Sequence, residues 1–249
     1  MIVSYKKEMK YFFLNILNGN WTELFFFIVK IALTLYSNLF IHKKKMLQCP
    51  ICLYKGYSFI HLSNSIRLTL NSECPKCHSR SRHRGLFFLY KEILNEKRSK
   101  RILHFAPEVY LVKILKSNQQ HEYHTADLFM ENVSFKEDLQ KLSFKDNSYD
   151  IVLNNHVLEH IFDDRKAIKE IQRILKPKGK AIITVPGNWK KKTKKFLTLQ
   201  NNGHYRDYGF DFIILLKKIF SKVSIKKLNE YNGALYAIKN DEIAFVCTK

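Results

Sequence analysis

The stretch DNSYDIVLNNHVLEHIFDDRKAIKEIQRILKPKGKAIITVP, residues 146–186, has the pattern that decides the fold. Residues 149–154 form a short apolar run, which is typical of a strand buried on both faces. Residues 164–175 place apolar side chains at helical spacing, and Gly179 follows as a terminator. Residues 180–185 are a second apolar run. A strand, a helix and a strand in this order predict one unit of a parallel sheet.

The same alternation continues on both sides of this stretch. Further strands are expected at 101–105, 122–128, 133–135, 223–228 and 243–248. Further helices are expected at 81–96, 109–115 and 210–220. The pattern predicts an α/β fold, a doubly wound and mainly parallel Rossmann-like sheet with helices on both faces. Ligands of such folds bind at the carboxyl ends of the strands, near the point where the strand order reverses.

Composition limits the classes of protein to consider. The chain has 249 residues, of which 46% are hydrophobic, so it is too apolar to be disordered and long enough for one medium domain with a small appendage. Its 43 Lys and Arg residues against 22 Asp and Glu give a formal net charge of +21. Such a field attracts phosphate, an anionic membrane surface or an acidic polymer. A lysine-rich composition without any partner is the open alternative.

Four of the five cysteines form two Cys-x-x-Cys units, Cys49 with Cys52 and Cys74 with Cys77. Two such turns can complete a tetrahedron around zinc, with zinc–sulfur distances of about 2.3 Å. Four thiolates close the site, so the predicted Zn²⁺ is structural. Disulfides and a redox dithiol are the less favoured alternatives. Cys247 lies in an apolar run and is interpreted as a packed strand residue.

Residues 21–41 are nearly continuously apolar and long enough to cross a bilayer, which takes roughly 20 residues. Four polar side chains interrupt the run at helical spacing, namely Glu23, Lys30, Thr34 and Ser37. A narrow polar stripe on an apolar helix is typical of a helix at a membrane surface or against a partner. Residues 21–45 are therefore a candidate membrane contact. The alternative is a helical arm that packs on the body or on a second copy.

These observations predict three parts. Residues 1–45 are an apolar helical arm, residues 46–80 a zinc ribbon, and residues 81–249 the α/β domain. No cleavage site for a secretory signal follows the apolar run, so we expect a cytoplasmic protein, bound to the cytoplasmic face of the membrane if the arm contacts lipid.

The order of motifs in residues 146–186 resembles the second half of a class I S-adenosyl-L-methionine (SAM)-dependent methyltransferase, with a methyltransferase type 11-like domain. From about Cys49 to the C-terminus, the chain resembles a little-characterised bacterial subgroup with an N-terminal zinc ribbon. The further segments that support this resemblance are Arg80–Arg84 (RSRHR), His104–Glu108 (HFAPE) and His204–Gly209 (HYRDYG). It implies methyl transfer from SAM.

The resemblance also implies roles for residues at the strand ends. The turn after the first strand would lie beside the methionine part of SAM, the next two strand ends would meet the ribose and the adenine, and the fourth would face the sulfonium and the acceptor. These residues are Phe105, Ala106, Pro107 and Glu108; Asp127; Asp138 and Leu139; and Asn154, Asn155 and His156. Asn154 and His156 are the candidate catalytic residues. For Asp127 and Asp138, the alternative is the capping of turns.

The turn at 105–108 departs from the family pattern, which has glycines there so that backbone can approach the cofactor. Ala106, Pro107 and Glu108 replace them, and His104 stands where an acidic residue is usual. His156 and His160, with Glu159 beside them, suggest a metal pair or a general base, and shaping of the pocket floor is the structural alternative.

The acceptor side is expected in the segment after the fifth strand, with His204, Arg206 and Tyr208 as candidate substrate residues. By analogy, the acceptor is an oxygen or nitrogen on a small molecule or on a surface-glycan precursor. One alternative is an RNA methyltransferase that binds phosphates through Arg80, Arg82, Arg84 and residues 190–195. The other is a non-catalytic scaffold associated with the membrane.

Overall fold

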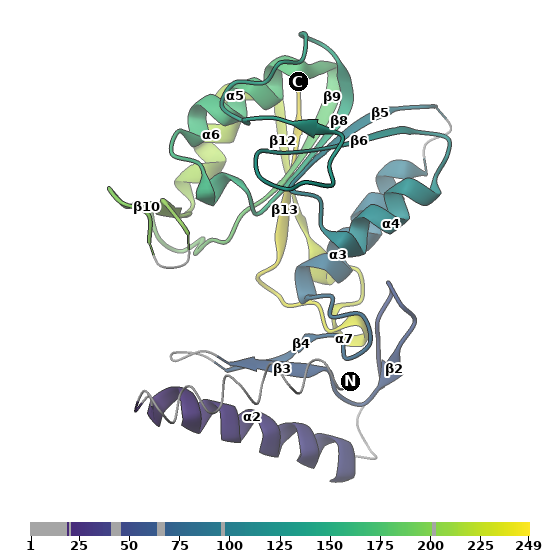
Figure 1. The fold of residues 1–249 in the computed structure, drawn as a ribbon, viewed down its shortest axis with the longest axis vertical. Coiled ribbons are helices and arrows are strands. Elements are labelled where there is room, and N and C mark those ends of the chain that lie inside the picture. Colours follow the sequence, from purple (N-terminus) through teal and green to yellow (C-terminus); the bar gives the residue numbers. More distant parts are fainter. Residues whose placement is uncertain (1–18, 20, 41–45, 64–67, 96–97, 201–202) are drawn as a thin grey trace. The chain divides into compact units, whose positions relative to one another are not determined.

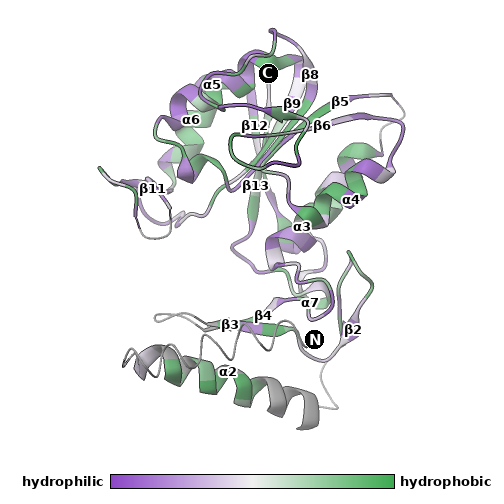
Figure 2. Ribbon diagram, in the orientation of Figure 1, coloured by the Kyte–Doolittle hydropathy of each residue, from purple (hydrophilic) through white to green (hydrophobic). Residues whose placement is uncertain are grey.

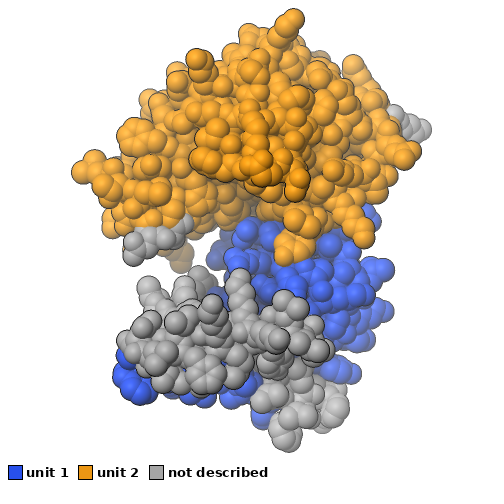
Figure 3. Space-filling model, viewed as in Figure 1, with its two compact units in different colours: residues 1–92, 228–242 blue, residues 93–227, 243–249 orange. Residues whose placement is uncertain are grey.

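The computed structural model describes residues 19, 21–40, 46–63, 68–95, 98–200 and 203–249. The chain folds into two compact units, shown in different colours in Figure 3. Unit 1 consists of Met1–Glu92 together with Leu228–Glu242, and unit 2 consists of Ile93–Lys227 together with Ile243–Lys249. Each unit is described by itself below.

Unit 2 contains a seven-stranded sheet (Figure 1). Its strands, in spatial order, are β12 (Lys222–Lys227), β13 (Ile243–Thr248), β9 (Leu175–Thr184), β8 (Tyr149–Asn155), β5 (Arg101–Phe105), β6 (Glu122–Asp127) and β7 (Phe135–Lys136). β13 runs antiparallel to both of its neighbours, and all the other neighbouring pairs are parallel. The strand order reverses between β5 and β8, which is where a doubly wound sheet binds ligands.

The register brings the ends of the central strands together. Phe105, at the end of β5, is opposite both Ala126 on β6 and Asn154 on β8. On the far side of β6, Asp127 is opposite Lys136 on β7. The carboxyl ends of four strands therefore lie along one edge of the sheet.

Helices cover both faces of this sheet. α5 (Asp164–Ile174) and α6 (Asp211–Ile219) pack on one face, and α4 (Val109–Ser117) lies on the other (Figure 1). The apolar positions predicted to face inward, Ile168 and Ile171, are fully buried in the core. Figure 2 shows apolar strands between helices whose outer faces are polar. The predicted doubly wound, mainly parallel fold is confirmed.

Most predicted elements occur close to their expected bounds. The weak third strand is reduced to the two residues of β7, and β9 begins directly after α5 at Leu175, five residues earlier than expected. Cys247 is fully buried on β13, and burial raises the pKa of its thiol to about 12. The interpretation of Cys247 as a packed strand residue is thereby confirmed.

Unit 1 consists of small elements. They are α2 (Trp21–Phe40), the antiparallel pairs β1 (Leu47–Gln48) with β2 (Lys55–Gly56) and β3 (Ile60–Ser63) with β4 (Leu68–Glu73), most of α3 (Ser81–Leu94), the 3-10 turn η2 (Leu228–Glu230) and α7 (Gly233–Tyr236). The predicted arm helix corresponds to α2. The side chains of its polar stripe, Glu23, Lys30, Thr34 and Ser37, lie outside the described residues, as do residues 1–18 and 41–45. Among the helices described, none combines the length and the apolar character needed to cross a bilayer.

One buried arginine connects segments that are far apart in the sequence of unit 1. The guanidinium of Arg84, on α3, donates hydrogen bonds of 2.6–3.3 Å to backbone carbonyls in residues 1–92 and in residues 228–242. The acceptors are the carbonyls of Asn71, Ser72, Ser79, Tyr236 and Ala237. Residues 228–242 therefore belong with residues 1–92, although the sequence analysis places them in the α/β domain. The predicted division at residues 45 and 80 stays a prediction.

Candidate functional site

The four paired cysteines lie at two turns of the same conformation. In the first, Leu53 donates its amide to the carbonyl of Cys49 at 2.9 Å, and in the second, His78 donates to Cys74 at 2.9 Å. Leu53 and His78 both have positive φ, 60° and 61°. Each turn therefore folds back so that its two thiols point to one place.

The separations of the sulfur atoms fit a tetrahedral metal site. Cys49 Sγ lies 3.7 Å from Cys77 Sγ, and Cys52 Sγ lies 3.5 Å from Cys74 Sγ. A tetrahedron with zinc–sulfur bonds of about 2.3 Å has edges of about 3.8 Å. A disulfide would bring two sulfurs to about 2.05 Å, and all four cysteines are free thiols. The predicted Cys cluster is thus present with the spacing that zinc requires.

Arg84 also contributes to the electrostatics of this cluster. Burial lowers the pKa of Arg84 to about 10, and the nearby Cys49, Cys74 and Cys77 oppose that shift when they are thiolates. Hydrogen bonds from Cys74 and Cys77 lower the pKa of Cys49. Zinc with four thiolates carries two net negative charges, which the buried guanidinium partly compensates. Arg84 is fully buried, so its predicted contact with RNA phosphates is wrong.

The turn after β5 has the conformation that glycine favours, without glycine. Ala106 has a φ of 44°, in the left-handed region, and its amide donates to the carbonyl of Ala126 at 3.0 Å. This φ is costly for a residue with a Cβ. Ala106 is therefore strained, at a position where glycine would carry no such cost.

Glu108 turns toward the neighbouring strand ends. Its Oε2 accepts a hydrogen bond of 2.8 Å from Nδ2 of Asn155, and lies 3.7 Å from Nε2 of His104. Thr184, at the end of β9, donates to Oδ1 of Asn155 at 3.4 Å. Residues from three neighbouring strands and the turn thus form one polar network at the sheet edge.

His104 extends this network into the interior. It is fully buried, and its Nδ1 lies 2.9 Å from the hydroxyl of Tyr123 on β6. Burial, together with the charge of Glu108, raises the pKa of Tyr123 well above its usual range, so Tyr123 stays a neutral phenol. The buried His104 therefore has Tyr123 as its hydrogen-bond partner.

Asp127 and Asp138 both cap turns. Oδ1 of Asp127 accepts the amides of Phe129 and Met130, and Oδ1 of Asp138 accepts the amide of Gln140. The capping alternative is thus present in the structure, and the contacts with ribose and adenine stay predictions. Leu139, predicted to meet the adenine ring, is 4% exposed and belongs to the hydrophobic core.

Asn154 and His156, the candidate catalytic residues, differ in environment. Asn154 is fully buried, and neither Nδ2 nor Oδ1 has a hydrogen-bond partner among the described residues. His156 lies on the bend after β8 with a φ of 52°, and its Nδ1 is 3.2 Å from Oε1 of Glu159. The orphaned amide is a polar group that a bound ligand could satisfy.

The three candidate substrate residues follow β9 and pack against the segment after β8. Arg206, on β11 (Arg206–Asp207), donates to the carbonyls of Leu158, Ile161 and Phe162. The hydroxyl of Tyr208 donates to Asp164 at 3.0 Å, and burial raises its pKa well above the usual range. Arg206 therefore fixes the segment 158–162 in place.

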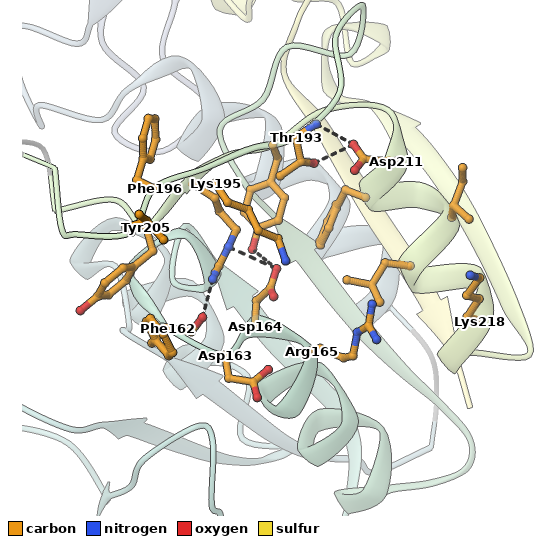
Figure 4. A pocket seen from close by; sticks show the side chains of 16 residues that line it. Phe162, Asp163, Asp164, Arg165, Thr193, Lys195, Phe196, Tyr205, Asp211 and Lys218 are labelled. Atoms are coloured by element: carbon orange, nitrogen blue, oxygen red, sulfur yellow. Dashed lines mark hydrogen bonds and ion pairs between the residues drawn. The ribbon is translucent and has the colours of Figure 1, made fainter.

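A cavity of about 670 Å³ lies beside these residues (Figure 4). Its walls come from the start of α5, from residues 193–208 and from α6, and Arg206 and Tyr208 are among them. Asp211 accepts two hydrogen bonds of 2.7 Å from Thr193 at its rim. The predicted cofactor residues do not line this cavity.

Sequence reasoning missed most of the partners in these networks. Asp164, which the sequence placed only at the start of a helix, accepts a hydrogen bond from Tyr208 and lies 3.5 Å from Nε of Arg206. A buried arginine requires such partners, but they lie more than 40 residues away in sequence. The residues around Arg206, HYRDYG at 204–209, form no apolar run that could have signalled its burial.

Comparisons with known proteins agree with this arrangement. Residues 90–183 match the family described as a methyltransferase domain. No curated protein matches the chain. Among solved structures, the 1,6-didemethyltoxoflavin-N1-methyltransferase of Burkholderia thailandensis, solved with 1,6-didemethyltoxoflavin and S-adenosylhomocysteine, has a TM-score of 0.51 at 17% identity, over 68% of this chain and 78% of that one.

Two further structures share less of the fold. The phosphoethanolamine N-methyltransferase 2 of Haemonchus contortus has a TM-score of 0.47 at 19% identity, over 66% of this chain and 52% of its own. The protein YcgJ of Bacillus subtilis has a TM-score of 0.43 at 17% identity, over 58% of this chain and 70% of its own. The family match over residues 90–183, the strand order and the reversal between β5 and β8 thus agree on a Rossmann-like methyltransferase fold for the sheet of unit 2.

Proposed function

We propose that this chain is a SAM-dependent methyltransferase that transfers a methyl group to an oxygen or nitrogen of a small molecule or a surface-glycan precursor. We also propose that Cys49, Cys52, Cys74 and Cys77 bind a structural Zn²⁺. A structure of similar fold, whose name includes the small molecule 1,6-didemethyltoxoflavin, supports a small acceptor.

One observation supports the enzyme most strongly. The residues predicted to bind SAM come from four separate segments, and the sheet register places Phe105, Asp127 and Asn154 along one edge, at the reversal of strand order. That is where α/β sheets of this type bind their ligands. The buried amide of Asn154, without a partner among the described residues, is a polar group for the bound cofactor to satisfy.

In methyl transfer from SAM, the protein mainly has to position the reactants. SAM supplies a methyl group that is already activated on a sulfonium, so the chain must hold the acceptor in line with it and exclude water. His156, on the bend after β8 and paired with Glu159, is our candidate for removing a proton from the acceptor. His204, Arg206 and Tyr208 border the acceptor side, where Arg206 holds the segment 158–162 in position.

Titration calorimetry tests binding of the cofactor. We expect SAM and S-adenosylhomocysteine to bind the full chain, and Asp127→Ala to weaken both by roughly tenfold through the loss of a ribose contact. Asp146→Ala, which changes an exposed carboxylate elsewhere in the same unit, is the matched control. The absence of heat with either ligand would leave the fold as a scaffold and contradict the proposal. Radiolabel transfer from SAM to fractionated cell extract then identifies the acceptor class.

We propose a cytoplasmic location, with residues 21–45 as the candidate contact with a membrane surface. Separation of cell lysate into soluble and membrane fractions tests this. Release of the protein from membranes by high salt indicates surface binding, and recovery in the soluble fraction at low salt contradicts the membrane contact. Nucleic acid is an alternative partner for the exposed lysines of residues 190–195, which a salt-dependent RNA shift assay would show.

A further inference from the structure

Two histidines and a glutamate converge beside the end of β8. Glu159 and His160 belong to the 3-10 turn η1 (Leu158–His160), and His204 comes from the segment before β11. One ligand atom from each of the three lies within 4.8 Å of the others. The backbone holds the two segments together, because the amide of Tyr205 donates to the carbonyl of Glu159 at 2.8 Å.

Glu159 is the deepest member of this group. Its side chain is 1% exposed, and its Oε1 lies 3.2 Å from Nδ1 of His156. Its other oxygen, Oε2, is buried and has no hydrogen-bond partner among the described residues. Burial of a carboxylate is costly unless a cation or donors compensate both oxygens. One oxygen of Glu159 thus lacks the partner that such a site normally provides.

His160 has the arrangement of a metal-binding imidazole. Its Nδ1 lies 2.7 Å from the carbonyl of Gly203, which makes Nδ1 the donor and leaves the lone pair of Nε2 for a ligand. Metal-ligating histidines almost always donate their second ring nitrogen to such an acceptor. His160 is exposed, whereas Glu159 is buried, so an ion could enter past His160.

The ring of His204 lies edge-to-face with that of His160, with ring centroids 5.0 Å apart. Bonds of about 2.1 Å from nitrogen and oxygen to a metal place neighbouring ligand atoms about 3–4 Å apart. Closing the three side chains from separations of up to 4.8 Å therefore needs rotation of side chains and no change of fold.

We propose that Glu159, His160 and His204 bind a divalent first-row transition-metal ion. Imidazole nitrogen selects such ions over Mg²⁺ and Ca²⁺, which favour oxygen alone. Three protein ligands leave coordination positions open for water or for an oxygen atom of a small molecule. This site is separate from the Cys cluster, whose four soft thiolates select zinc, and the inference does not depend on methyl transfer.

Equilibrium dialysis of the full, zinc-loaded chain against Co²⁺, followed by metal analysis, tests the proposal. We expect one Co²⁺ per chain in addition to the zinc of the Cys cluster. The near-ultraviolet spectrum of the added Co²⁺ should lack the intense sulfur-to-cobalt charge-transfer bands, because its ligands are imidazole and carboxylate and not thiolate. His160→Ala combined with His204→Ala should weaken Co²⁺ binding by at least about 100-fold.

Two single variants keep the test decisive if the double variant folds poorly. Glu159→Gln preserves shape and removes the charge, and should lose Co²⁺ binding while its near-ultraviolet circular dichroism stays native. Glu131→Gln removes an exposed carboxylate elsewhere in the same unit and should bind Co²⁺ as the unchanged chain does. If the unchanged chain binds no Co²⁺ beyond the Cys cluster, or if Glu159→Gln binds it equally well, the three side chains only fasten the segment 203–205 to η1 and the proposal fails.

Discussion

The side-chain amide of Asn155, at the end of β8, donates a 2.8 Å hydrogen bond to the carboxylate of Glu108, in the turn after β5. This bond connects the two strands between which the strand order reverses. The bond bears on our prediction that this turn lies beside the methionine part of SAM, whose carboxylate is negatively charged like Glu108. Glu108 faces Asn155 and His104, so its charge is held by partners within the protein.

Replacing Glu108 should therefore affect stability in a graded way. Glu108→Ala leaves the amide of Asn155 without its acceptor, and we expect the free energy of unfolding to fall by about 1–3 kcal/mol. Glu108→Gln retains an acceptor oxygen and should cost less than about 1.5 kcal/mol. Urea denaturation of the two variants measures the difference. Equal losses in both would show that the bond to Asn155 contributes little.

Ala106→Gly should stabilise the protein. A left-handed residue with a Cβ costs about 1–2 kcal/mol, and the greater freedom of glycine in the unfolded chain offsets about 0.5–1 kcal/mol of the gain. The net effect is a stabilisation of about 0.5–1 kcal/mol, measured by denaturant unfolding. Ala167→Gly, within α5, should instead destabilise by about 1 kcal/mol. Destabilisation by both would argue against strain at Ala106.

Arg84→Lys should weaken unit 1 despite keeping the positive charge. Lysine cannot reach five carbonyls in the planar arrangement of a guanidinium, and we expect a loss of at least about 3 kcal/mol. Zinc release to a colorimetric chelator should become faster in this variant. The control is Arg80→Lys at a nearby exposed position, where the change should stay within about 0.5 kcal/mol. Similar release rates in both variants would contradict this role.

Acid should weaken the fold through Glu170. Hydrogen bonds from Arg173, chiefly, lower the pKa of Glu170 below its usual range, although partial burial opposes the shift. A carboxylate whose pKa is lowered by folding stabilises the protein above its unfolded pKa of about 4.3, and loses that contribution as the pH falls through the folded pKa. The difference in unfolding free energy between the unchanged chain and Glu170→Gln should thus be largest above about pH 5. A difference that stays constant between pH 3 and pH 7 would refute this linkage.

Local patterns made much of the fold predictable. The strand at 101–105, the helix that begins at Asp164 and the last strand at 243–248 occur at their expected starts, because apolar runs and caps act over a few residues. The two Cys-x-x-Cys turns were predictable for the same reason. The alternation of strands and helices predicted a parallel sheet, and the carboxyl ends of parallel strands lie at the same edge of the sheet.

Features that depend on long-range partners could not be predicted in this way. Arg84 was a candidate phosphate contact in the RNA methyltransferase alternative, whereas its five carbonyl partners lie up to 153 positions away. The bond between Glu108 and Asn155 and the group formed by Glu159, His160 and His204 likewise join segments separated by more than 40 residues. Burial of polar side chains has no periodic signature in sequence, so only coordinates reveal it.

Because residues 228–242 belong to unit 1, the synthesis of unit 1 is interrupted by that of most of unit 2. Arg84 and the cysteine turns are synthesised before unit 2, but the carbonyls of Tyr236 and Ala237 that Arg84 requires follow 152 and 153 residues later. Unit 1 is therefore begun before unit 2 but completed only after most of unit 2 has been synthesised. A nascent chain halted before residue 236 leaves Arg84 without two of its five carbonyl acceptors.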